Sequence, residues 1–290
     1  MLKLQLVAIG NSKDEAEEIV SIVNSFLVSL LPIKKITPAS LIVKDECIYV
    51  APSGVERKLS RIPPSRRYFF DMHPTEDFFA SIRKIPLYYP IYVFNGRFSY
   101  IKLLMKECKR RGIYHNFFPI AFLDQPKSDV ELLLKRAEYI VGIDRKMGTQ
   151  ALFSEEYRYF LRGNVKIITG RRAASAASAG KLLAGIASYY ETAMKTELET
   201  IKEMHLGGED VEISSNVLFN RIFEVAVQLA NAKYRINANE GKNSYDDELF
   251  LEDDGLELTG EPERDFRKIE ARILDFELLR QRIQMLTRGL

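Results

Sequence analysis

The sequence is poor in the residues from which metal centres and disulfide scaffolds are most often built. It has two cysteines, Cys47 and Cys108, and three histidines among 290 residues. The cysteines lack zinc-ligand spacing, so we expect a reduced, cytoplasmic chain. The histidines His73, His115 and His205 are too far apart in sequence to form a metal-ligand motif, so no metal site is expected.

Long apolar runs are also missing. A membrane-spanning helix needs roughly 18 or more consecutive apolar residues. The best candidate, residues 26–33, is short and contains Ser29 and Pro32. The apolar residues 4–9 are followed at once by acidic residues, unlike a signal peptide. We therefore expect no membrane partner.

Recognisable catalytic motifs are absent as well. There is no Gly-x-Ser-x-Gly elbow and no phosphate-binding loop of the Gly-x-x-x-x-Gly-Lys-Ser/Thr type. The composition, 46% hydrophobic and 28% charged, excludes a collagen-like or disordered chain. The sequence thus indicates a globular protein but names no catalytic residue and no cofactor.

The formal net charge of +2 conceals an uneven distribution. Residues 246–263 hold nine acidic side chains and no basic one, which leaves +11 for the rest of the chain. Asp253, Asp254 and Gly255 form a hairpin signal within this segment. We interpret the segment as a solvated or docked hairpin, with a metal site or a mimic of nucleic-acid charge as alternatives. A docked segment would shield a cationic edge of the remaining protein.

The central part of the chain alternates between short apolar runs and amphipathic stretches. This alternation predicts an α/β fold with a three-layer, Rossmann-like parallel sheet, in one or two lobes. The predicted strands are 90–94, 117–123, 139–143 and 165–169, and the predicted helices are 98–111, 128–137, 149–161 and 173–204.

The N-terminal region predicts a strand over 4–9 and a helix that Ser12 and Glu15 open as a capping box. Residues 40–43 and 47–50 are expected to be strands joined by a turn at 44–46. The domain ranges that follow are an N-terminal lobe 1–89, a second lobe 90–205, and a helical extension 206–290. The final helix, 264–288, repeats apolar residues at intervals of three and four, which suits core packing or a homodimer seam.

Ligands of open parallel sheets bind at the carboxyl ends of the strands. If the predicted strands share a sheet, five polar or cationic strand ends converge on one edge. The candidate ligand-binding residues there are Asn11, Ser12, Asn95, Arg97, Asp124, Asp144, Arg145, Gly170, Arg171, Arg172 and Ser175.

The segment 170–175 is the most informative of these strand ends. Arg171 and Arg172 precede a helix whose first residues are only Ala, Ser and Gly, so an anion can approach the helix N-terminus. The same small residues also suit tight helix packing. Asp124 and Asp144 would hold hydroxyl groups or a metal, or else cap neighbouring backbone, and 95–97 is otherwise an ordinary turn.

Our leading hypothesis is a cytoplasmic ligand-binding or regulatory protein that recognises a small anionic metabolite or nucleotide. The first alternative is a transferase or hydrolase acting on a phosphorylated or nucleotide substrate. The second is a nucleic-acid-associated protein that uses the basic stretches 57–67 and 109–111 with the aromatic residues of 68–122. Nucleic acid is the less favoured partner because a core needs most of those aromatic residues.

Overall fold

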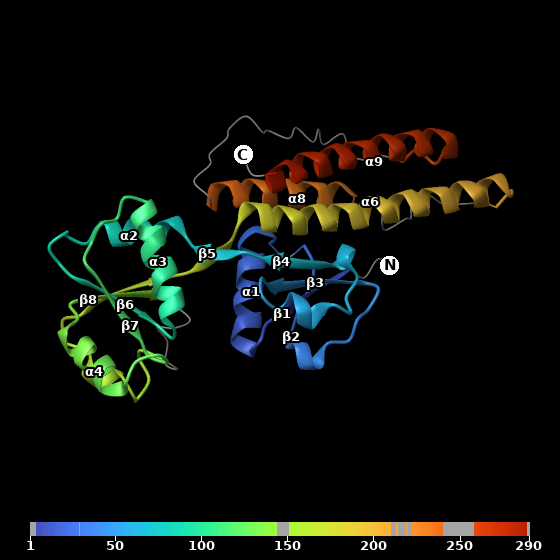
Figure 1. The fold of residues 1–290 in the computed structure, drawn as a ribbon. Helices are drawn as coiled ribbons and strands as arrows, with labels where there is room; N and C mark the ends of the chain where they lie inside the picture. The colour runs from blue at the N-terminus through green and yellow to red at the C-terminus, as the bar shows by residue number, and fades with distance from the viewer. Residues whose placement is uncertain are drawn as a thin grey trace. The chain divides into compact units, whose positions relative to one another are not determined.

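The computed structural model describes residues 4–28, 30–143, 151–209, 213, 219, 222–239 and 258–288. The chain divides into two compact units. Unit 1 comprises residues 1–72 and 174–290, and unit 2 comprises residues 73–173. Each is described by itself below (Figure 1).

Unit 1 is built on a four-stranded sheet with strand order β2-β1-β3-β4. All neighbouring strands run parallel. Its strands are β1 (Gln5–Ile9), β2 (Ile33–Ile36), β3 (Cys47–Pro52) and β4 (Arg67–Phe70). Because β1 lies between β2 and β3, the chain reverses direction across the sheet after β2, so a topological switch point lies between β1 and β3.

Helices cover one face of this sheet. The helices α1 (Lys13–Phe26) and α6 (Ala176–Leu206) contact the strands. The helices α8 (Ile222–Asn239) and α9 (Pro262–Met285), the last followed by η6 (Leu286–Arg288), pack on α1 and α6. The apolar sides of α1 and α6 pack with Leu6, Val50 and Phe70 in one core, and α6, α8 and α9 lie side by side (Figure 1). The other face packs against short 3-10 helices, η2 (Glu56–Leu59) and η3 (Pro64–Arg66), with Leu59 and Ile62 in the core.

Unit 2 repeats the topology with strand order β7-β6-β8-β9, again all parallel. Helices α2 and α3 pack on one face, and α4 with residues 151–161 packs on the other. The elements are α2 (Glu76–Arg83), β6 (Ile91–Asn95), α3 (Phe98–Arg110), β7 (Phe117–Ala121), α4 (Lys127–Arg136), β8 (Tyr139–Ile143), η4 (Arg158–Phe160) and β9 (Lys166–Gly170).

The two chain segments that connect the units pair with each other. β5 (Met72–Pro74) follows β4, β10 (Arg172–Ala174) follows β9, and the two strands form a separate two-stranded sheet. The Thr75 N–H donates to the Arg171 carbonyl and the Ser175 N–H donates to the Asp71 carbonyl, so the strands run antiparallel.

The predicted fold class is confirmed: the protein is α/β with two four-stranded parallel sheets. The units divide at 72/73 and 173/174, whereas the sequence placed boundaries at 89/90 and 205/206. The difference has two causes. Helix α2 packs on β9 and so joins unit 2, and α6 packs on α8 and α9 and so joins unit 1.

The predicted strand at 40–43 and its hairpin with 47–50 are wrong. Residues 38–40 form a 3-10 helix, Ile42 is 73% exposed, and β3 instead pairs in parallel with β1. The Tyr49 hydroxyl fastens the irregular segment by accepting from the Lys44 N–H and donating to the Ile42 carbonyl. The strand β2 was not predicted from the sequence, because this edge strand exposes Lys34 and Lys35 and shows no apolar alternation.

The predicted helix over 149–161 is also wrong in its described part, 151–161, which consists of successive turns and η4. The Ser154 carbonyl accepts from the N–H groups of both Tyr157 and Arg158. These tight turns bury Ala151, Leu152 and Tyr157 against unit 2. The helix predicted from 173 begins at Ala176 instead, because residues 172–174 pair in β10.

The final helix is confirmed as α9 with η6. Its apolar seam is buried in the unit 1 core, from Phe266 through Ile273 and Phe276 to Ile283. The homodimer through this helix stays a prediction. The proposed acidic shield at 246–263 lies outside the described residues up to position 257. Within the described part of the chain, no helix has the length and apolar character of a membrane span.

Candidate functional site

The polar groups of the loop after β1 form hydrogen bonds with nearby protein groups. The Asn11 backbone N–H donates to the Glu15 carboxylate at 2.7 Å, and the Asn11 side-chain oxygen accepts from Lys58 Nζ at 2.8 Å. Ser12 caps α1 by accepting from the Glu15 N–H at 3.2 Å. A Cβ at Gly10 would lie 2.2 Å from the Ala16 nitrogen, so α1 requires glycine there.

The polar groups of the loop after β6 form similar hydrogen bonds. Arg97 Nη1 lies 2.6 Å from Asp124 Oδ1, and the other Asp124 oxygen accepts from the Phe98 N–H at 2.8 Å, at the start of α3. The Phe98 hydrogen bond and then the Arg97 guanidinium lower the pKa of Asp124. The structure therefore brings Arg97 and Asp124 together as an ion pair at the start of α3. Asn95 is buried at the end of β6.

The segment 170–175 joins β9 to α6 through β10. Gly170 is buried, and a Cβ there would lie 2.5 Å from the ring of Phe78. Arg171 and Arg172 both interact with other residues. Ser175 caps α6 by accepting from the Ser178 N–H at 3.2 Å. The small residues that follow are packed: a Cβ at Gly180 would lie 2.8 Å from Leu286 Cβ.

The five predicted strand ends do not share one sheet edge. Residues 10–12 follow β1 in unit 1, whereas the other four strand ends belong to the sheet of unit 2. Asp144 and Arg145 lie outside the described residues. The ligand-binding role of the eleven residues stays a prediction.

The basic stretches 57–67 and 109–111 are partly neutralised by neighbouring acids. Arg66 pairs with Asp45 at 2.6 Å, Arg110 with Glu107 at 2.9 Å, and Arg111 with Glu76 at 2.7 Å. These pairs reduce the charge that each stretch can offer to a phosphate backbone.

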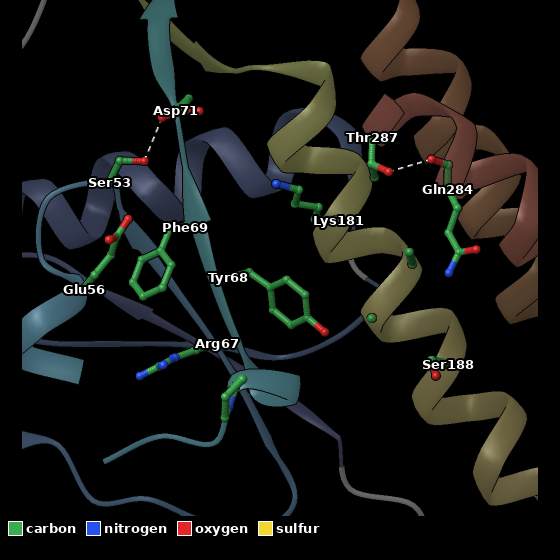
Figure 2. Close-up of a pocket in the computed structure, with 13 residues that line it drawn as sticks. Ser53, Glu56, Arg67, Tyr68, Phe69, Asp71, Lys181, Ser188, Gln284 and Thr287 are labelled. Carbon is green, nitrogen blue, oxygen red and sulfur yellow. Dashed lines mark hydrogen bonds between the residues drawn. The ribbon is translucent and has the colours of Figure 1, made fainter. Parts of the chain in front are cut away.

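A cavity of about 770 Å³ lies within unit 1, beside β4 (Figure 2). We call it cavity 1. This volume falls in the range of small-molecule sites, roughly 300–1,000 Å³. It is bounded by the ends of β3 and β4, by η2, by one side of α6 and by the end of α9. Its lining residues are Ser53, Glu56, Pro64, Arg67, Tyr68, Phe69, Asp71, Lys181, Ala184, Gly185, Ser188, Gln284 and Thr287.

Cavity 1 has two cations and two carboxylates. Arg67 donates to the Leu59 carbonyl at 3.0 Å, and Asp71 accepts from Ser53 Oγ at 2.8 Å. Lys181 extends from α6 towards the space beside Tyr68 (Figure 2). Neither Lys181 nor Glu56 has a hydrogen bond or ion pair within the described part of the chain. The cavity therefore offers one unpaired cation and one unpaired carboxylate.

A second cavity of about 610 Å³ continues along α6, and we call it cavity 2. It shares Tyr68, Gly185 and Ser188 with cavity 1, and Thr192 lies farther along the same side of α6. Burial raises the pKa of Tyr68, whose hydroxyl donates to the Ser65 carbonyl at 2.9 Å. Tyr68 therefore stands between the two cavities as a neutral partition.

Cys47 also lines cavity 2. Burial raises its pKa, which disfavours the reactive thiolate form. It is therefore a structural thiol in this cavity.

None of the nine predicted residues that the structure describes lines cavity 1. Two of its members nevertheless follow the rule that the sequence reasoning used, because Ser53 comes directly after β3 and Asp71 directly after β4. Placing the strands of 47–52 and 67–70 in a parallel sheet would have drawn attention to them. Lys181 was not selected from the sequence, although it is the first charged residue after the run of small residues that begins at 173.

No protein-family model, curated protein or solved structure matches this chain.

Proposed function

We propose that this chain is a ligand-binding protein that takes a small anionic ligand in cavity 1. The class of ligand is the one that the sequence favoured, but the site lies beside β4 rather than at the eleven predicted residues. An anionic group would contact Lys181, and hydroxyl or amine groups of the ligand would contact Asp71 and Glu56.

One observation carries the proposal: Lys181 reaches a cavity of ligand size and has no hydrogen bond or ion pair with the described residues. An unpaired ammonium beside strand ends attracts an anion, and the carboxylates nearby select against ligands that lack donor groups. The carboxylates also argue against a bare polyanion, because Glu56 and Asp71 would repel it.

The test is a thermal-shift series with inorganic phosphate, succinate, glutamate and adenosine monophosphate. A ligand that binds only the folded state stabilises it by about 2.7 kcal/mol at a hundredfold excess over its Kd. We expect a shift with at least one of these anions. Lys181→Met should weaken that binding at least tenfold, about 1.4 kcal/mol, without loss of the helix, since Met favours helices.

Lys102→Met is the matched control. Lys102 is an exposed lysine on α3 of unit 2 and has no partner among the described residues. It should bind the same anion as the unchanged protein. Equal binding by the Lys181→Met and Lys102→Met variants would refute the site.

A further inference from the structure

The free edge of β4 opens into cavity 1. β4 is the end strand of its sheet. Phe69 packs with the core next to η2, whereas Tyr68 packs with the core next to α6, so the two side chains lie on opposite faces. Figure 2 shows Phe69 and Tyr68 on opposite sides of the strand. A cavity lined by both side chains must lie along the edge of the strand.

The main-chain hydrogen bonds show which groups that edge presents. The Phe70 carbonyl accepts from the Ser53 N–H at 3.0 Å, on the side of β3. The Asp71 carbonyl accepts from the Ser175 N–H at 2.8 Å, on the opposite side. Neighbouring residues of a strand direct their main-chain groups to opposite sides. Arg67 and Phe69 therefore direct an N–H and a carbonyl each towards the open side.

No described residue forms a hydrogen bond with these four groups on that side. Unpaired strand edges are templates for a further strand, and proteins usually block them. Here the groups border a cavity of about 770 Å³. The edge is therefore open where the cavity lies.

We propose that the ligand of cavity 1 is an extended peptide that adds to β4 as a fifth strand of the unit 1 sheet. This inference rests on the proposed function, since it names the ligand class of the same site. Strand addition uses main-chain hydrogen bonds for affinity and alternate side chains for selectivity. The main-chain groups of Arg67 and Phe69 would form the hydrogen bonds, and the charged residues of the cavity would select the side chains of the peptide.

The charges predict what the peptide carries. Lys181 lies on the same side of β4 as Tyr68, and Glu56 lies on the same side as Phe69 (Figure 2). Neighbouring side chains of the bound strand point to these opposite sides. The peptide is therefore expected to place an acidic residue towards Lys181 and an adjacent basic residue towards Glu56.

The test uses the full chain and the fluorescent octapeptide acetyl-Thr-Val-Thr-Glu-Lys-Thr-Val-Thr-amide, followed by fluorescence anisotropy. Each peptide nitrogen is then methylated in turn. A methyl group removes one donor and separates paired strands. We expect a loss of at least tenfold at alternate positions and less than twofold at the positions between them.

A charge exchange tests the orientation. Lys181→Glu should weaken binding of the octapeptide, and replacing the peptide's Glu with Lys should restore it. Equal sensitivity at every methylated position, or no binding of the peptide, would overturn strand addition. In either case a Lys181-dependent shift with glutamate or phosphate would leave the proposed function standing, whereas loss of both responses would refute both.

Sedimentation velocity tests whether a second copy of the chain occupies the edge of β4. We expect the peptide to leave the oligomeric state of the chain unchanged. A dimer that the peptide dissociates would mean that a second copy occupies the edge, and this would overturn the inference.

Discussion

The two units have the same strand order, but their fourth strands, β4 and β9, pack differently against a helix. In unit 1, Tyr68 on β4 reaches α6 at Gly185, where a Cβ would lie 1.9 Å from the tyrosine oxygen. In unit 2, the aromatic residue is on the helix and the glycine is on the strand: Phe78 of α2 covers Gly170 of β9, where a Cβ would lie 2.5 Å from the ring.

The exchange of the two residue types changes how closely the helix packs on the strand in each unit. Tyr68 on the strand and Gly185 on the helix line both cavities of unit 1. A glycine on the strand lets the helix ring lie directly on the backbone, and Phe78 is accordingly buried. The first arrangement leaves room for a ligand, and the second seals the core.

The sealed edge should be the more fragile of the two. Gly170→Ala forces a methyl group against the buried Phe78 ring, which cannot move away. We expect a loss of about 2–3 kcal/mol of unfolding free energy, as for other overpacked cores. Urea denaturation measures it, and amide exchange should place the loss in unit 2. Gly163→Ala is the control, because a Cβ there meets nothing within 4 Å.

The next largest effect is expected from acid, which should lower the unfolding free energy of unit 1 by protonating Glu191. Glu191 on α6 binds Lys195 at 2.7 Å and Arg280 of α9 at 2.6 Å. Burial raises the pKa of Glu191, but the hydrogen bonds from Lys195 and Arg280 outweigh it, and the net pKa is lowered. The stabilisation is therefore present above the unfolded pKa, near 4.5, and is lost as the pH falls through the folded value.

The variant Glu191→Gln removes this titration. We expect a cost of about 2 kcal/mol at pH 7, because Arg280 keeps its charge but loses its nearer partner, with only Glu277 left at 3.8 Å. The cost should shrink as the pH falls below the unfolded pKa near 4.5 and through the lower folded pKa. Urea denaturation at each pH measures it. A cost that stays constant across this range would show that the pair does not titrate as inferred.

A smaller loss of stability is expected at the open edge. Gly185→Ala meets only the end of the half-buried Tyr68 side chain, which can turn into the adjacent cavity. We expect a cost of about 1 kcal/mol or less. Because Tyr68 would then fill part of cavity 1, binding of the octapeptide should fall at least tenfold. Gly163→Ala, which lies outside cavity 1 and whose Cβ meets nothing within 4 Å, should leave the binding within twofold.

Sequence patterns were sufficient for the regular parts of both sheets. The strands β6 to β9 are short, mainly apolar runs bounded by turn residues, and β6 and β8 are buried along their whole length. The edge strand β2 lacks such a pattern, because it exposes Lys34 and Lys35. The candidate site depends on two contacts that link distant residues, Tyr68 with Gly185 and Asp71 with Ser175. No local pattern contains such contacts, so the sequence indicated the kind of site but not its position.

The smallest effect on stability is expected at the ion pair after β6. Arg97 is exposed, so Arg97→Ala should leave the unfolding free energy nearly unchanged. It should also raise the pKa of Asp124 towards its usual value without restoring it fully, because the Phe98 N–H still donates to the carboxylate. A carboxyl NMR titration measures this pKa. If Arg97→Ala abolished the anion response and Lys181→Met did not, the ligand would bind in unit 2, and the functional contrast between the two edges would be reversed.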